Sequence, residues 1–187
     1  MTVPTGRAAP TAELFKDAFR AHPAGIAVIT AQGPDGPVGL TASSVSSVSA
    51  EPPVLAFSVS TASPSAAALV QADTLVVHLL GADQLGIAQL FATRGADRFG
   101  GAADWYPLPS GEPLLADAPW ALRCRILHRL PVGGSMIIAA EVLSIEQGTH
   151  DDVAPLVYHN RRWHVLTDRS ALPPAVAPFF VVYGRDE

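Results

Sequence analysis

Two runs of alternating side chains joined by a turn constrain the fold of this chain more than any other feature. In residues 120–130, the apolar side chains of Leu122, Cys124 and Ile126 alternate with arginines. Residues 131–135, Pro-Val-Gly-Gly-Ser, have turn chemistry, and residues 136–146 are again mostly apolar. We therefore expect a long antiparallel hairpin, with His128 on the apolar face as a buried core histidine.

Shorter patterns of the same kind occur along the rest of the chain. Turn residues and alternating apolar positions predict strands at 25–32, 37–41, 54–59, 74–80, 155–159 and 162–166. Helices are expected after the N-cap residues Thr11, Ser63 and Asp83. Residues 93–119, rich in Gly, Pro, Asp and Ala, are expected to form a long loop with a short strand at 114–116.

This order of elements predicts a mainly β fold with helices (α+β). An antiparallel barrel capped by two or three helices is favoured, because closing a sheet removes its exposed edges. A chain of 187 residues is long enough for one such domain. We place that domain at 11–167, after a disordered arm at 1–10. The extension at 168–187 is rich in proline and apolar residues, and we expect it to pack on the barrel or on a partner subunit.

The composition excludes several classes of partner. A net charge of -5, with only 12 Lys and Arg residues, argues against nucleic acid, which requires clustered cations. No apolar run approaches the ~20 residues that a membrane helix needs, and the first residues lack the apolar core of a signal peptide. The single cysteine, Cys124, suits a reducing cytoplasm. Only 16% of the residues are charged, which predicts a surface covered by a second subunit.

The sequence lacks the motifs of three common classes of functional site. No Gly-x-Ser-x-Gly elbow supports a hydrolytic triad. None of the six histidines has a metal-ligand partner at helical spacing, so no metal is expected. Neither a Gly-x-Gly-x-x-Gly turn after a strand nor a Walker A lysine is present, so a dinucleotide would not be held by a Rossmann fold.

A run of small hydroxyl residues is the best candidate for a ligand site. Residues 39–60 read GLTASSVSSVSAEPPVLAFSVS, in which the first half is almost free of bulky side chains and of charge. A ligand can therefore lie close to the backbone, and hydroxyls suit a polar planar ligand better than a metal. Residues 58–65 then lead from a strand into a helix start with four hydroxyls, which indicates an anion site. Simple N-capping by Ser63 is the equally weighted alternative.

Four segments resemble the short-chain flavin reductases of the FMN-binding split-barrel fold. They are HPAGIAVIT at 22–30, GLTASSVSSVS at 39–49 followed by Pro-Pro, FATRGADRF at 91–99 and PLVYHNRRW at 155–163. The resemblance implies a homodimeric antiparallel split barrel with FMN or FAD at the subunit interface. It also implies hydride transfer from NADH or NADPH to the flavin, often to supply a partner monooxygenase.

The resemblance also implies roles for individual residues. Thr41, Ala42, Ser43 and Ser44 would lie along the flavin ring, with Ser46 and Ser58 near the ribityl chain and Ser60, Ser63 and Ser65 near the phosphate. Phe99 and His159 would approach the nicotinamide face, with Trp163 close by, and His159 is the one catalytic candidate. A structural role for His159 in a strand turn is nearly as well supported.

The chain departs from the family in one respect. Many relatives carry Arg or Lys in the segment that matches 58–63, where this chain reads Ser-Val-Ser-Thr-Ala-Ser. Losing a charge-assisted phosphate contact costs ~1.5–3 kcal/mol. Either Arg94 or Arg98 supplies the missing charge, or the flavin is held loosely as a diffusible substrate. The remaining alternatives are a flavin-bound oxidoreductase that acts on another small substrate, and a non-catalytic flavin-binding protein.

Overall fold

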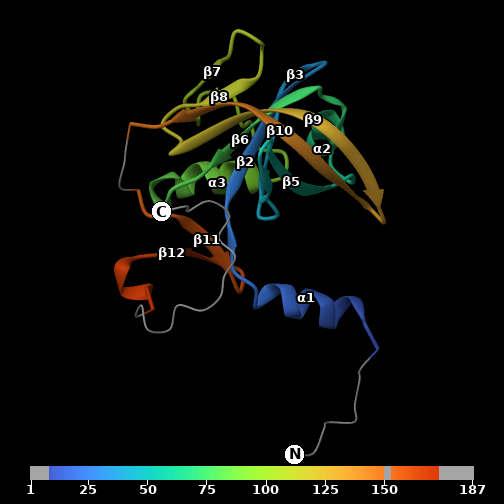
Figure 1. The fold of residues 1–187 in the computed structure, drawn as a ribbon, viewed down its shortest axis with the longest axis vertical. Helices are drawn as coiled ribbons and strands as arrows, with labels where there is room; N and C mark the ends of the chain where they lie inside the picture. Colours follow the sequence, from blue (N-terminus) through green and yellow to red (C-terminus); the bar gives the residue numbers. More distant parts are fainter. Residues whose placement is uncertain (1–8, 150–152, 173–187) are drawn as a thin grey trace, which may run out of the picture.

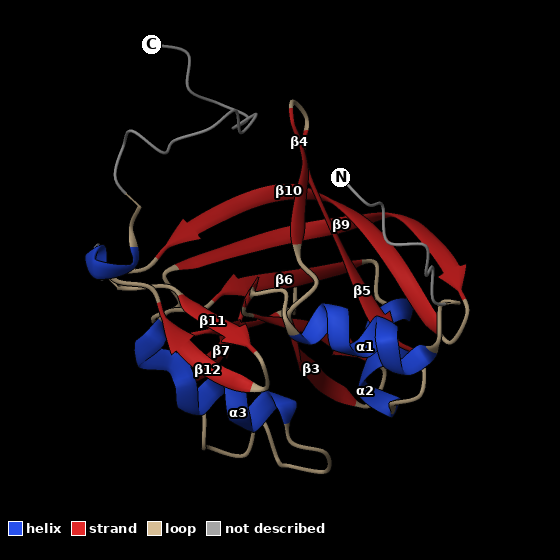
Figure 2. Cartoon of the chain, turned by 90° about the horizontal axis from the view of Figure 1, so that it is seen from below, coloured by secondary structure: helices blue, strands red, loops and turns tan. Residues whose placement is uncertain are grey.

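The two longest strands form the predicted hairpin. In the computed structural model, β9 (Trp120–Val132) and β10 (Ser135–Gln147) pair along their whole length and run across the molecule (Figure 2). The structure describes residues 9–149 and 153–172. Within these ranges it has twelve strands, three α-helices and two short 3₁₀ helices (Figure 1).

Seven strands form one antiparallel sheet that curls into a barrel without full closure. Their order is β3-β2-β6-β9-β10-β5-β4. The strands not yet given bounds are β2 (Ala27–Gly33), β3 (Gly36–Ala42), β4 (Ser46–Ala50), β5 (Pro53–Ser60) and β6 (Thr74–Leu79). Their inward side chains make a continuous apolar core that includes Ile29, Phe57, Leu75 and Ile138. The predicted α+β fold, an antiparallel split barrel, is confirmed, as are the strands at 54–59 and 74–80.

The barrel is left open along one line. β3 and β4 are the two ends of the sheet, and β4 pairs only with the first half of β5. The second half of β5 therefore has a free edge next to β3. One side chain from the β3–β4 connection bridges this seam, because Ser44 Oγ both donates to Ser58 O and accepts from Ser58 N, each at 3.0 Å.

Two helices pack on the barrel. Helix α2 (Pro64–Gln71) begins as predicted, with Ser63 Oγ accepting from Ala66 N at 3.1 Å and Pro64 in the first position. Helix α3 (Leu85–Ala92) follows a 3₁₀ turn at Ala82–Gln84. The prediction that Asp83 caps α3 is wrong: Asp83 lies inside the 3₁₀ turn, and neither helical segment has a side-chain N-cap hydrogen bond.

Helix α1 (Ala12–Arg20) instead extends away from the barrel (Figure 1). Its predicted N-cap is confirmed, since Thr11 Oγ1 accepts from Leu14 N at 3.2 Å. None of its residues is buried, and Leu14, Phe15 and Phe19 are between 51% and 63% exposed. Helix α1 therefore does not cap the barrel, although two or three capping helices were expected. Its apolar face is exposed in the single chain.

The segment at 93–119 contains more structure than expected. It includes a small hairpin of β7 (Trp105–Pro107) and β8 (Pro113–Leu115), which covers the outer face of β6 and β9. Buried His78 holds this hairpin: its Nδ1 lies 3.1 Å from Val28 O, and its Nε2 accepts from Leu115 N at 3.0 Å. Burial lowers the pKa of His78 to about 4, so its ring is neutral near pH 7. His78 is therefore a core histidine whose two ring nitrogens both have partners.

A buried ion pair fixes the other end of the same hairpin. The carboxylate of Glu112 is 1% exposed and pairs with Arg123 at 2.9 Å. Burial alone would raise the pKa of Glu112, but hydrogen bonds from Ser110, Thr74 and Arg123 outweigh it and lower the pKa to about 2. The carboxylate therefore stays charged near pH 7.

The prediction for His128 is wrong, because the hairpin contains an irregularity. The register shifts between Ala139 and Ala140, so that Leu127 is left without a partner in β10. An extra residue moves every later side chain to the opposite face. His128 is consequently exposed, while the guanidinium of Arg129 donates to Val70 O and Ala72 O at the C-terminal end of α2, both at 2.6 Å.

A separate three-stranded sheet joins the two ends of the domain. It has the order β1-β11-β12, with β1 at Ala24–Gly25, β11 at Leu156–His159 and β12 at Arg162–Val165. The predicted strands at 155–159 and 162–166 are confirmed, and a tight turn with Asn160 and Arg161 at φ 49° and 60° joins them. Most of the expected arm (1–8) and of the extension (173–187) lies outside the described residues. No helix in the described ranges has the length and apolar character needed to cross a bilayer.

Candidate functional site

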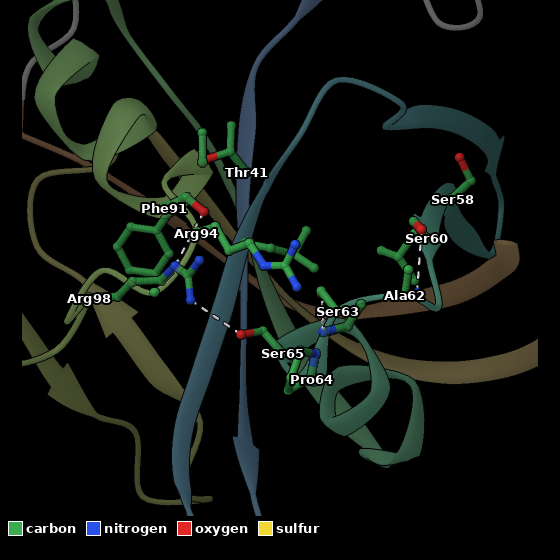
Figure 3. A pocket seen from close by; sticks show the side chains of 15 residues that line it. Thr41, Ser58, Ser60, Ala62, Ser63, Pro64, Ser65, Phe91, Arg94 and Arg98 are labelled. Carbon is green, nitrogen blue, oxygen red and sulfur yellow. Dashed lines mark hydrogen bonds between the residues drawn. The ribbon is translucent and has the colours of Figure 1, made fainter. Parts of the chain in front are cut away.

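A first pocket opens where β5 leads into α2. We call it the α2 pocket; it has a volume of about 620 Å³ (Figure 3). Its lining includes five residues that the sequence singled out: Thr41, Ser58, Ser60, Ser63 and Ser65. Residues of the hydroxyl run and of the helix start thus line one pocket.

The hydroxyls of this pocket differ in what they can still offer a ligand. Ser60, Ser63 and Ser65 each accept a hydrogen bond, from Ala62 N at 3.4 Å, Ala66 N at 3.1 Å and Arg98 Nη1 at 3.2 Å respectively. Since a hydroxyl has one donor as well as its acceptors, all three keep an O–H to donate to an anion. Thr41 instead donates to Ala88 O at 2.7 Å, so its hydroxyl is occupied by the contact with α3.

The backbone of β5 adds a donor to the same pocket. In an antiparallel strand, the N–H and C=O of one residue point to the same edge, and alternate residues point to the same side. Ser58 directs both groups to Ser44 at the seam. Ser60, two residues later, therefore directs its N–H to that side, beyond the end of β4.

Two arginines supply positive charge. Arg94 and Arg98 both line the α2 pocket, opposite the N-terminus of α2 (Figure 3). Arg98 is fixed by the carbonyls of Phe91 and Thr93, at 3.3 and 2.8 Å, and by Ser65. Within the described residues, Arg94 makes no hydrogen bond or ion pair. No acidic side chain is among the residues that line the pocket, so the site favours an anion.

A second pocket lies on the other side of Ser58. We call it the α1 pocket; its volume is about 1000 Å³, and it lies between α1, the β3–β4 connection and the β11–β12 turn. It contains Ser43, Ser44, Ser46 and His159 of the predicted site, and it shares Ser58 with the α2 pocket. His159 is half-buried, with its ring centroid 5.6 Å from that of His164.

Three predicted residues lie behind these pockets rather than in their lining. Ala42 is 7% exposed and belongs to the barrel core. Phe99 packs edge-to-face between Phe91 and Trp105, with ring centroids 5.4 and 5.2 Å away. Trp163 packs against Tyr158 at 4.9 Å. In this structure the two aromatic rings support the walls of the site.

The sequence did not single out the cations of the α1 pocket. Lys16 and Arg20 come from α1, and Arg161 comes from the β11–β12 turn. The only signal was the Arg161-Arg162 pair, and nothing in the sequence indicates that this turn lies beside α1. A backbone hydrogen bond from Asn160 N to Arg20 O, at 2.9 Å, brings them together.

The side chains of the site are suited to binding rather than to proton transfer. No carboxylate lines either pocket, and the two lining imidazoles, His22 and His159, both belong to the α1 pocket. Burial raises the pKa of the Cys124 thiol to about 12, so it is not a nucleophile near pH 7. Chemistry at such a site is carried by a bound cofactor or substrate.

The split barrel carries two cationic, hydroxyl-lined pockets, which suit a planar ligand with a phosphate group, such as a flavin nucleotide. Residues 19–167 match the family model described as flavin reductase like domain. The chain therefore belongs to the flavin reductase family, as the four sequence segments indicated.

Relatives and solved structures agree with this assignment. The chain is 39% identical over 152 residues to an NADH:FMN oxidoreductase of Rhodococcus qingshengii, covering 80% of this chain and 79% of that one. It is 38% identical over 168 residues to FMN reductase (NADH) RutF 1 of Methylorubrum extorquens, covering 88% and 82%.

Among solved structures, the flavin reductase domain protein of Arthrobacter sp. superposes with a TM-score of 0.78 at 35% identity, covering 83% of this chain and 95% of that one. BorF, the flavin reductase component of a bacterial two-component tryptophan halogenase, superposes with a TM-score of 0.74 at 29% identity, covering 85% and 100%.

Proposed function

We propose that this protein is a cytoplasmic NADH-dependent FMN reductase that supplies reduced FMN to a separate monooxygenase or halogenase. The observation that carries the proposal is the continuous outer surface from Ser43 to Ser65, which leads from an uncharged floor into a pocket with two arginines. The names of the relatives at 38–39% identity support FMN and NADH in particular. BorF supports a two-component system.

The α2 pocket fits a flavin phosphate. Its donors are the O–H groups of Ser60, Ser63 and Ser65, the N–H groups at the start of α2, and the guanidinium groups of Arg94 and Arg98. These two arginines replace the charge that the 58–63 segment lacks. We therefore favour a held phosphate over the loose binding that the sequence left open.

The flavin ring would lie along residues 41–44, with the ribityl chain near Ser46 and Ser58. The hydroxyls of Thr41 and Ser44 are already occupied by the fold. We infer that this segment contacts the ring with its backbone and its small side chains, whereas Ser43 and Ser46 have exposed side chains available to a ligand. FMN, when bound, supplies the acceptor for the hydride of NADH.

His159 is proposed to position the nicotinamide, as the resemblance implies. It lies on the wall of the α1 pocket, across from the 43–46 segment. Phe99 and Trp163 would act through the walls that they support.

A second copy of this chain is the proposed cover for the site. The 43–46 segment is mostly exposed in the single chain, and hydride transfer requires that water be excluded. The open apolar face of α1 lies next to this segment and offers an interface. The proposed domain remains 11–167, with the extension at 168–187 on the barrel or on the partner.

Two measurements test the proposal. Quenching of flavin fluorescence gives the dissociation constants of FMN and FAD separately, and we expect tighter binding of FMN. Oxidation of NADH is then followed at 340 nm with and without added FMN, and the rate should depend on FMN. No oxidation above background with either flavin would overturn the proposal. A flavin that remains bound while NADH is oxidised poorly would favour the oxidoreductase that acts on another substrate.

A further inference from the structure

One short loop carries both arginines of the α2 pocket. It leads from the end of α3 towards the β7–β8 hairpin, and we call residues 93–98 the arginine loop. Arg98 closes this loop on itself, because its guanidinium donates to the carbonyls of Phe91 and Thr93 at 3.3 and 2.8 Å. Gly95 within the loop is at φ 76°, a left-handed conformation that glycine adopts without strain.

The two arginines of the loop are held in different ways. Arg98 donates its third bond to Ser65 Oγ at 3.2 Å, so its guanidinium is fixed by contacts of its own. Arg94 lines the same pocket but makes no hydrogen bond or ion pair in the part of the chain that the structure describes (Figure 3). The position of the Arg94 guanidinium therefore depends on the backbone of the arginine loop.

The first end of the arginine loop is anchored through Phe91. This side chain is 1% exposed, and a Cβ added at Gly39 of β3 would lie 2.6 Å from its ring. The ring therefore packs directly on the backbone of β3. Thr41, on the same strand, donates to Ala88 O at 2.7 Å and so holds the helix that leads into the loop.

The second end of the loop is anchored by Trp105 of β7. Its indole Nε1 donates to the carbonyl of Phe99, the residue directly after the loop, at 3.1 Å. The rings of Trp105 and Phe99 also meet edge-to-face with centroids 5.2 Å apart, and Phe99 meets Phe91 in the same way at 5.4 Å. Edge-to-face pairs are a favoured arrangement of aromatic rings. Three stacked rings thus join both ends of the arginine loop to the hairpin.

The hairpin that carries Trp105 is itself attached to the barrel. His78 Nε2 accepts from Leu115 N at 3.0 Å, and Leu115 pairs with Trp105 across the hairpin. The buried carboxylate of Glu112 pairs with Arg123 of β9 at 2.9 Å. Trp105 lines neither pocket, so it offers the loop a fixed point of attachment outside the ligand site.

We propose that Trp105 is a positioning residue for FMN: it fixes the arginine loop so that Arg94 meets the flavin phosphate in the α2 pocket. The inference rests on the proposed function, because it requires a phosphate in that pocket. Trp105 itself touches neither the flavin nor NADH. Its substitution should therefore weaken only the contact that Arg94 makes.

Trp105→Phe removes the indole N–H and keeps an aromatic ring in the stack. We expect it to raise the dissociation constant of FMN about fivefold, which corresponds to the loss of one hydrogen bond. Riboflavin, which has no phosphate, should bind with unchanged affinity. Fluorescence titration of the full-length protein measures both constants. Trp120→Phe is the matched control, because Trp120 is 43% exposed, lines neither pocket and makes no indole hydrogen bond to any described residue.

A double variant tests whether Trp105 acts through Arg94. Without the Arg94 guanidinium, Trp105 has nothing left to position, so Arg94→Ala/Trp105→Phe should bind FMN no more weakly than Arg94→Ala. Hydrogen exchange of the ligand-free proteins tests the loop directly. Amides of residues 93–98 should exchange faster in Trp105→Phe than in Trp120→Phe, because the loop opens at a lower free energy. Urea denaturation verifies that each variant is folded.

Several outcomes would overturn the inference. Equal losses of affinity for FMN and riboflavin in Trp105→Phe would mean that the substitution disturbs the whole site. Additive losses in the double variant would mean that Trp105 and Arg94 act independently. If Arg94→Ala weakens FMN binding but Trp105→Phe does not, the inference fails and the proposed function stands. If Arg94→Ala leaves FMN binding unchanged, the phosphate assignment in the α2 pocket fails together with the inference.

Discussion

Arg98 and Ser65 connect the two walls of the α2 pocket: Arg98 Nη1 donates to Ser65 Oγ at 3.2 Å. The same guanidinium donates to the carbonyls of Phe91 and Thr93 at the end of α3. Arg98 is thereby held in place by the fold before any ligand binds. Arg94, beside it in the pocket, makes no such bond within the described residues. The two arginines thus differ in how their substitution should affect stability and binding.

Arg94→Ala should weaken FMN binding without destabilising the protein. Removing one charge-assisted phosphate contact raises the dissociation constant by about one order of magnitude. Riboflavin has the same ring but no phosphate, so its affinity should be the same in both proteins. Fluorescence titration with the two flavins measures this difference. A tenfold loss for riboflavin as well would show that Arg94 contacts the ring or supports the fold.

Arg129→Leu should destabilise α2, although Arg129 lies outside both pockets. Its guanidinium donates to Val70 O and Ala72 O, where the helix dipole also favours a cation. We expect a loss of about 2 kcal/mol in the free energy of unfolding, measured with urea. Arg125→Leu on the same strand is the control, because the pair of Arg125 with Glu141 is solvent-exposed and contributes less than ~1 kcal/mol. Equal losses in the two variants would contradict this account.

Stability should fall as the pH drops below about 6.5. The pKa of His78 is lowered to about 4 in the folded protein, so the unfolded chain binds a proton more readily between these values. The free energy of unfolding should therefore decrease by about 3 kcal/mol across that window and stay constant above it. The pKa of Glu112 is lowered from its ordinary value of 4.5 to about 2. The free energy of unfolding should therefore decrease further as the pH falls below 4.5.

Urea denaturation at a series of pH values measures this slope. His78→Gln should flatten the upper part of the curve, between about pH 6.5 and pH 4.5, at the cost of lower stability at neutral pH. A variant that keeps the slope of the unmodified protein would show that another group causes the acid sensitivity.

Leu14→Glu should convert the proposed dimer to a monomer. Leu14 is 51% exposed on the apolar face of α1, and it does not line the α1 pocket. A charge there opposes burial against a second copy. Light scattering measures the mass, and Tyr106→Ser is the control, since β7 lies at the other end of the molecule (Figure 1). A monomeric unmodified protein would rule out the interface.

The local elements of the fold follow directly from the sequence. Ser63 and Pro64 start α2 where the capping pattern predicts, and the Asn160-Arg161 turn forms as its residues indicate. Such features depend on neighbouring residues alone. The face of His128 was mispredicted because one unpaired residue, Leu127, reverses the alternation, and alternation was the only available signal.

The site was predictable only in part, for a related reason. The hydroxyls at 41–65 are contiguous in the sequence, so their pattern is visible there. Arg94 and Arg98 could be proposed only because a charge was missing elsewhere, and the structure places both in the pocket. Lys16, Arg20 and Arg161 meet through the contact of α1 with a turn 140 residues later, Asn160 N to Arg20 O, which no local pattern encodes.

The seam of the barrel has a consequence for its motion. Strands β6 and β9 are paired on both edges, whereas no strand pairing joins β3 to the end of β5, where Ser44 of the β3–β4 connection bonds to Ser58. Backbone amides along this line should exchange with solvent through local opening, at a lower free energy than those of the central strands. The proposed flavin floor lies on the same line, so a bound flavin would protect these amides. Release of the flavin product would then require the same local opening of the seam that exposes these amides to solvent.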